Sequence, residues 1–177
     1  MDRFLEEIVV KKNKVLNEIL FVLSMVVMIL SALMGLFNLQ FLFYAFSVPQ
    51  LVVTLINIGI AVVLFLFRDR LRTDYEYTFT NGDMDFAMVF NNRKRKSLGS
   101  LKVNRVDAFG KVSSPAFQRY ITMPGVRKDN WFLNRGAELY YFYFQKEANK
   151  RIIIIEPSEE MIGLIKKYIP QGVWQNN

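Results

Sequence analysis

The chain has 177 residues, of which 52% are hydrophobic and 22% are charged, and its formal net charge at pH 7 is +7. It contains no histidine and no cysteine, which excludes histidine acid–base chemistry, thiol nucleophiles and the usual zinc sites. A chain of this length accommodates one ordinary domain and a membrane anchor.

The first fifteen residues mix apolar and charged side chains. The apolar ones recur at helical spacing, at Phe4, Leu5, Ile8, Val9 and Val15. This spacing predicts a short amphipathic helix over residues 1–15 that lies in the membrane interface.

A long uncharged segment follows. From Ile19 to Phe67 there is no Asp, Glu, Lys or Arg. Because about 20 apolar residues cross a bilayer, this run predicts two spans, near Leu16–Phe37 and Pro49–Phe67, in a transmembrane hairpin over residues 16–72.

The turn of this hairpin is expected between two polar groups of residues. Asn38–Gln40 is the first polar cluster in the run, and Ser47 precedes a proline suited to a first helical turn. Basic residues flank the outer ends of both spans, at Lys11, Lys12, Lys14, Arg68, Arg70 and Arg72. The positive-inside rule therefore predicts a multi-pass protein of the cell membrane with both termini in the cytoplasm and Gln40 outside.

Three residues within the spans are small or polar. Ser31 and Gly35 form a small-xxx-small pair, and Asn57 lies near the middle of the second span, where an unpaired amide is costly. We expect the hairpin to pack on itself, with Ser31 near Asn57 and hydrogen-bonded. The alternative is a homo-oligomer or a membrane protein partner.

Residues 73–177 predict a cytoplasmic β domain. Alternating apolar residues in Tyr75–Phe79 and Met84–Phe90 flank Asn81-Gly82, a sequence typical of a type I′ turn. Looser alternation over Lys96–Val112 predicts one bent strand or two.

Regular structure is expected to resume at Trp131 after an irregular segment. Glu138–Gln145 and Arg151–Ile155 predict two strands that are apolar on both faces, joined by a turn over Lys146–Lys150. An amphipathic helix is predicted from Ser158 to Ile169, because acidic residues begin it, lysines end it and a proline follows.

Several antiparallel strands followed by one amphipathic helix resemble a pleckstrin-homology-like (PH-like) barrel. The resemblance rests on the Asn81-Gly82 hairpin, the basic Arg93–Leu98 segment and the ending Ile152–Glu160. Over nearly its whole length the sequence is similar to a family of small bacterial two-span membrane proteins with a cytoplasmic module of this kind. The resemblance implies an α+β membrane protein, in which a two-helix transmembrane hairpin precedes an antiparallel seven-stranded PH-like barrel with a C-terminal capping helix. It does not imply an enzyme.

Four consecutive basic residues form a candidate lipid-facing patch. They are Arg93, Lys94, Arg95 and Lys96. Each basic residue near an anionic leaflet contributes roughly 1 kcal/mol, so the run is expected to contact anionic lipid headgroups. The alternative is a solvated hairpin end. Nucleic-acid binding is disfavoured, because the aromatic Tyr140–Phe144 run lacks the basic-glycine-aromatic signature of RNA-binding sheets.

The irregular Ser113–Asn130 segment is a candidate partner-binding loop. Its most contact-prone side chains are Phe117, Arg119, Tyr120 and Arg127. Rings on both faces of Tyr140–Phe144 are expected to leave an apolar patch, unless the loop and the helix cover every ring.

These features together predict a membrane-tethered binding or scaffold module, or an accessory subunit of a membrane assembly. The expected partner is a protein or a second copy of the chain. The alternative is a domain that associates with anionic lipid of the inner leaflet. No catalysis, cofactor or metal is expected.

Overall fold

The computed structural model describes residues 3–146 and 149–175. The ends of the predicted N-terminal helix and β domain (residues 1–2 and 176–177) and part of the predicted Lys146–Lys150 turn (residues 147–148) lie outside the described residues. The chain forms two compact units: a β unit of residues 1–12, 74–89 and 94–177, and a helical unit of residues 13–73 and 90–93. Each is described by itself.

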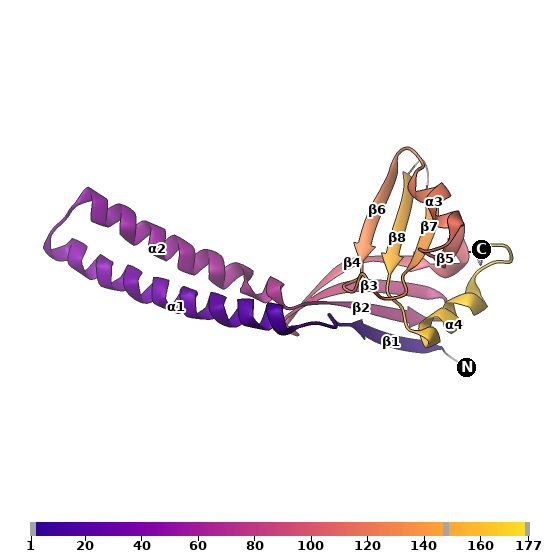
Figure 1. Cartoon of the computed structure of the whole chain (residues 1–177), viewed down its shortest axis with the longest axis horizontal. Helices are drawn as coiled ribbons and strands as arrows, with labels where there is room; N and C mark the ends of the chain where they lie inside the picture. The colour runs from indigo at the N-terminus through magenta and orange to yellow at the C-terminus, as the bar shows by residue number, and fades with distance from the viewer. Residues whose placement is uncertain (1–2, 147–148, 176–177) are drawn as a thin grey trace. The chain divides into compact units, whose positions relative to one another are not determined.

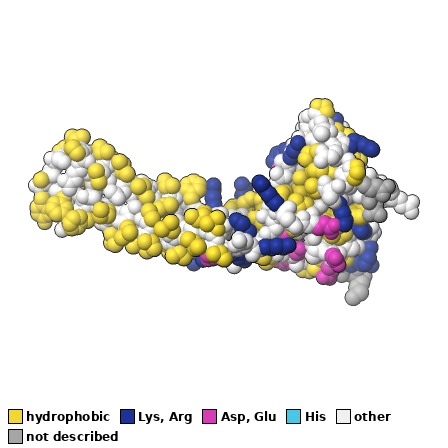
Figure 2. Space-filling view, viewed as in Figure 1, with side chains coloured by type: hydrophobic (Ala, Val, Ile, Leu, Met, Phe, Trp, Pro, Cys, Tyr) yellow, Lys and Arg dark blue, Asp and Glu magenta, His cyan; other side chains and the backbone are white. Residues whose placement is uncertain are grey.

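The helical unit is a pair of long apolar helices, α1 (Val15–Tyr44) and α2 (Val48–Phe67), which a three-residue turn connects (Figure 1). Within the segments Val15–Tyr44 and Val48–Leu71, an 18-residue stretch has a mean hydropathy of 2.7 and 2.5, respectively, and both segments are long and apolar enough to cross a membrane. On the face seen in Figure 2, the side chains of this pair are mostly hydrophobic. Both predicted spans are therefore present as candidate membrane helices.

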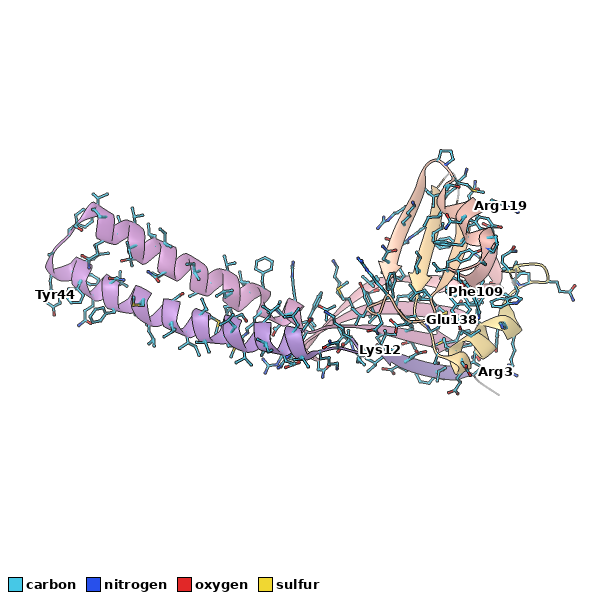
Figure 3. All side chains as sticks on the ribbon, viewed as in Figure 1. Arg3, Lys12, Tyr44, Phe109, Arg119 and Glu138 are labelled. Atoms are coloured by element: carbon cyan, nitrogen blue, oxygen red, sulfur yellow. The ribbon has the colours of Figure 1, made fainter. Side chains whose placement is uncertain are left out.

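The turn lies later in the chain than predicted. Asn38–Gln40 is helical, and α1 continues to Tyr44, which lies at the turn in Figure 3. The reason is that isolated polar side chains do not break a helix when no glycine or proline accompanies them. The turn ends at Ser47, whose hydroxyl accepts a hydrogen bond from the Gln50 amide at 3.3 Å, as a capping residue before a proline should.

The predicted contacts between the two helices are only partly present. Ser31 and Gly35 are buried, and a Cβ atom added to Gly35 would lie 3.0 Å from the Ile58 side chain. Asn57, however, donates its amide hydrogen bond to Val53 O of its own helix at 2.9 Å. Its polar group is thus satisfied within α2, and the expected bond to Ser31 is not needed.

The N-terminal residues form a strand, so the predicted interfacial helix over residues 1–15 is wrong. Strand β1 (Phe4–Val9) pairs antiparallel with β2 (Thr73–Thr80), and Val9 lies opposite Tyr75. Four apolar residues in six fit a helix or a strand, and the backbone hydrogen bonds to β2 decide for the strand. The β domain therefore starts before the hairpin rather than at residue 73, and the hairpin is inserted between its first two strands.

The first sheet has the order β1-β2-β3-β4. The β2–β3 hairpin turns at Asn81-Gly82, both with positive φ, as predicted. Its third and fourth strands are β3 (Asp83–Phe90) and β4 (Lys94–Lys102). The predicted Lys96–Val112 segment is two strands, because the short helix η2 (Val103–Arg105) separates β4 from β5.

The second sheet has the order β6-β8-β7-β5-β9. Its strands are β5 (Ala108–Lys111), β6 (Val126–Trp131), β7 (Tyr140–Lys146), β8 (Asn149–Ile155) and β9 (Trp174–Gln175). The segment expected to be irregular holds helix α3 (Pro115–Ile121) and most of β6. Helix α4 (Glu159–Tyr168) begins after Ser158, which caps the Met161 amide at 3.2 Å.

The core of the β unit lies between the two sheets and α4. Tyr77 and Phe86 from the first sheet, Phe109 and Phe142 from the second, and Ile165 from α4 are all essentially inaccessible to solvent. Figure 3 labels Phe109. A second cluster lies on the other face of β7 and β8, under α3. The β unit is thus an α+β domain with strands in two sheets and a C-terminal helix on the shared core.

Candidate functional site

The predicted basic patch is divided by the structure. Arg93, Lys94, Arg95 and Lys96 are all exposed, but the last three lie on β4, where successive side chains point to opposite faces. Arg95 forms an ion pair with the buried Glu76 at 2.8 Å and a longer one with Glu6 at 3.7 Å. Its charge is therefore largely neutralised within the sheet.

Arg93 belongs to a turn that packs within the helical unit. Asn91 and Asn92 have φ values of 48° and 53°, the left-handed conformation that asparagine adopts more readily than most residues. The Asn91 amide donates to Arg72 O at 2.6 Å, and its side chain donates to Asp69 at 2.9 Å. The β3–β4 turn is thereby joined to the residues that follow α2.

Arg72 is the centre of these contacts, a role that the sequence analysis missed. It forms an ion pair with Glu18, donates to Asn91 Oδ1 at 3.3 Å and lies 3.7 Å from the centre of the Phe21 ring. Asn17 adds a hydrogen bond to Leu71 O at 2.8 Å. Two features of the sequence could have indicated this ion pair: a lone acidic residue, Glu18, at the start of the first span, and Arg72 just after the second span.

These contacts place a group of basic side chains at one end of the helix pair. We define the basic collar as Lys14, Arg68, Arg70, Arg72 and Arg93. The guanidinium group of Arg68 lies over the Phe65 ring, 4.9 Å from its centre, and that of Arg70 lies over the Phe67 ring, 4.5 Å from its centre. Both charged groups are thus held against aromatic rings at the end of α2. Only Glu18 and Asp69 offset this charge among the described residues of that end, so the collar is suited to anions.

The candidate partner-binding loop is partly a core element. Phe117 is buried, with its ring centre 5.1 Å from that of Tyr141, and Tyr120 stacks on Tyr143 at 4.5 Å. These two residues hold α3 on the sheet; Phe117 is not available to a partner, and Tyr120 is half-buried. Arg119 is exposed on the outer side of α3 (Figure 3).

Arg127 is the fourth residue of that predicted site, and it lies on β6 rather than on α3. It is exposed and forms an ion pair with Asp129 at 3.3 Å. Asp129 also forms an ion pair with Arg151 of β8. Because Phe117 is buried, the four predicted partner-binding residues do not form one exposed surface.

The aromatic strand β7 is covered on both faces. Tyr140, Tyr141, Phe142 and Tyr143 are each 6% exposed or less. Burial raises the pKa of the Tyr141 hydroxyl to about 12 and raises the pKa of Tyr140 and Tyr143 as well. For these four aromatic residues, the alternative in which the loop and the helix cover the rings is therefore correct. They do not form the apolar patch that was the other expectation.

A polar contact holds the end of β1, and it too was missed. The Lys12 amide donates to Asn134 Oδ1 at 2.8 Å, and Asn134 Nδ2 donates to Val10 O at 2.9 Å. Glu156 fixes Asn134 by accepting hydrogen bonds from its side chain at 2.8 Å and its amide at 3.0 Å. The chain is thus tied down immediately before it enters the helical hairpin.

The sequence also matches a known family over almost its whole length. The Bacterial PH-like domain family (DUF6106) matches residues 1–175. The chain belongs to this family. The match includes β1 and the hairpin as well as the later strands. No curated protein and no solved structure matches it.

Within residues 3–146 and 149–175, no three His, Cys, Asp or Glu side chains lie close enough together to hold a metal ion. The arrangement offers two kinds of chemistry instead: charge at the basic collar, and backbone and apolar groups on the surface of the β unit.

Proposed function

We propose that this member of the Bacterial PH-like domain family is a membrane-anchored, non-catalytic module that presents its β domain to a protein partner at the cytoplasmic face of the cell membrane. The observation that supports this most directly is the insertion of the apolar hairpin between β1 and β2. Five residues join β1 to α1, and Arg72 alone separates the short helix η1 (Arg68–Leu71) from β2. Two short connections to neighbouring strands limit how far the domain can move from its anchor, which favours docking at a fixed site over searching.

The test is crosslinking in native membranes followed by purification of the tagged chain. We expect a stable protein partner or a second copy to be recovered with the full-length protein. The control is a chain in which Asn134→Ala and Glu156→Ala release the end of β1 while the hairpin is unchanged. Recovery of the monomer alone at every crosslinker length would contradict the proposal.

The proposed topology has a separate test. Reporters at both termini should respond to the cytoplasm, and a tag inserted after Ala45, in the observed turn, should respond to the outside. This site replaces Gln40, which is helical. A cytoplasmic signal from the turn would overturn the two-span arrangement.

Association with anionic lipid is the second candidate function, and the basic collar supports it. The decisive comparison is between Arg70 and Arg93, which belong to the collar, and Arg95, which does not. Replacing Arg70 and Arg93 with Gln should reduce enrichment of anionic lipid around the protein in mixed nanodiscs, whereas Arg95→Gln should not, because Glu76 already neutralises Arg95. Equal effects of the two variants would argue against the collar.

A further inference from the structure

Strand β1 has one side without a pairing strand. It is the terminal strand of the order β1-β2-β3-β4. The Asn81 amide donates to Arg3 O at 3.0 Å, so the odd-numbered residues of β1 exchange hydrogen bonds with β2. Because the pattern alternates along an antiparallel pair, the N–H and C=O groups of Phe4, Glu6 and Ile8 point away from β2.

The contact with Asn134 shows that outward-pointing backbone groups of this kind can form hydrogen bonds with another part of the protein. Val10 and Lys12 continue the same even-numbered series, and Asn134 satisfies the C=O of one and the N–H of the other. Its side-chain amide takes the place that the N–H and C=O groups of one residue in a neighbouring strand would take. Among the described residues, no backbone hydrogen bond engages the outward groups of Phe4, Glu6 or Ile8.

The exposed side chains of β1 also differ from those of the other long edges. Phe4 and Ile8 are 63% and 54% exposed. The edge strand β4 begins with Lys94–Lys96, and β6 exposes Arg127 and Lys128. Charged residues protect a sheet edge against pairing, so β4 and β6 are protected whereas β1 presents apolar side chains beside its open backbone groups.

We propose that the Phe4–Ile8 edge of β1 binds an extended segment of a partner protein, which adds a strand to the first sheet. This proposal rests on the proposed function and names the site for it. The segment has a basic residue opposite Glu6 and apolar residues two positions away on either side, opposite Phe4 and Ile8. Charge complementarity selects this occupant. The Glu6 side chain is 40% exposed and its ion pair with Arg95 is long, at 3.7 Å, so its carboxylate can pair with a basic residue on the added strand.

A second copy of the chain fits this edge poorly. The antiparallel self-pairing that uses all three residues places Glu6 opposite Glu6, and directly opposed like charges destabilise a sheet. The proposal therefore commits to a different chain, and dimers formed through β1 are an outcome that would contradict it.

The probe is the capped peptide Ac-Thr-Val-Thr-Lys-Thr-Val-Thr-NH2, added to the full chain in detergent micelles. The amides of Phe4, Glu6 and Ile8 should become protected from hydrogen exchange in a saturable way. Methylation of the lysine amide, which faces β1, should weaken binding about tenfold or more. Methylation of a neighbouring threonine amide, which faces away, should leave binding within about threefold, since it removes no bond to β1.

A charge exchange tests the basic residue independently. Glu6→Lys should weaken binding of the lysine peptide and favour the same peptide with glutamate at its centre. Equal effects of the two methylations, an unchanged preference in Glu6→Lys, or no binding of the parent peptide at millimolar concentration would each overturn the inference. Recovery of a crosslinked partner from native membranes despite those results would leave the proposed function standing without this site.

Discussion

Val9 and Tyr75 lie opposite each other in one antiparallel ladder, although the chain between them forms both long apolar helices. Val9 is 6% exposed and Tyr75 is 8% exposed, so this pair is part of the core of the β unit. The β domain is therefore assembled from residues on both sides of the apolar helical hairpin, and β1 is needed to complete it.

The first prediction concerns the isolated β domain. A fragment of residues 73–177 lacks β1, which leaves one side of β2 unpaired and removes the Leu5 and Val9 side chains from the core. We expect it to be less stable, by about 3 kcal/mol or more, than a fragment in which a short turn joins residues 3–12 to residues 73–177. Urea unfolding of the two fragments measures the difference, and equal midpoints would show that β1 is dispensable.

The second prediction concerns the ion pair between Arg72 and Glu18. Their side chains are 34% and 44% exposed, so solvent screening limits the coupling to about 1 kcal/mol or less. Arg72→Gln should cost more than Glu18→Gln, because Arg72 also holds Asn91 and the Phe21 ring. A double-mutant cycle by thermal unfolding of the full chain in micelles measures the coupling, and strictly additive effects would exclude it.

The third prediction concerns two residues of α3 that the sequence analysis placed in one binding site. Phe117→Ala should lower the free energy of unfolding by about 3 kcal/mol, because it removes a buried ring from the cluster under α3. Arg119→Ala, two residues away and exposed, should change it by no more than about 0.5 kcal/mol. Chemical unfolding in micelles compares the two; similar losses would mean that α3 does not cover the sheet.

The fourth prediction concerns alkaline pH. Burial raises the pKa of Tyr141 to about 12, whereas in the unfolded chain it is about 10. The folded protein thus keeps a proton that the unfolded chain loses, so this stabilisation is complete below pH 10 and is lost as the pH rises toward 12. Each such tyrosine contributes a slope of about 1.4 kcal/mol per pH unit in that window.

Tyr141→Phe is the matched variant for this effect. Its hydroxyl is buried without a hydrogen-bond partner among the described residues, so removing it should not destabilise the protein at pH 8. Between pH 10 and 12 the variant should lose stability less steeply than the native chain. Parallel pH profiles would show that Tyr141 does not ionise on unfolding.

Local sequence patterns predicted several elements well. The two apolar runs, the Asn81-Gly82 turn and the helix after Ser158 are all present near their predicted positions. Each depends on interactions within a few residues: helical periodicity, a left-handed turn or a capping hydroxyl. Among these elements, the end of α1 lies later in the chain than predicted, because polar residues alone do not end a helix.

The predicted sites were less successful because they depend on distant partners. Arg95 is basic in sequence but is paired with Glu76, nineteen positions earlier in the chain. Phe117 looked like a contact residue in a loop but packs on Tyr141. In each case, a residue on a strand from elsewhere in the chain makes the side chain unavailable to a lipid or a protein partner.

The sequence by itself determined the apolar hairpin, the β character of the later residues and the C-terminal helix, because hydrophobic periodicity and caps are local properties. Only the tertiary structure decided that Phe4–Val9 is a strand. The spacing of its apolar residues suits a helix in an interface as well as a strand in a sheet, and the two differ in where their backbone hydrogen bonds go. Those bonds are made with β2, more than sixty residues away, and no local pattern specifies such a partner.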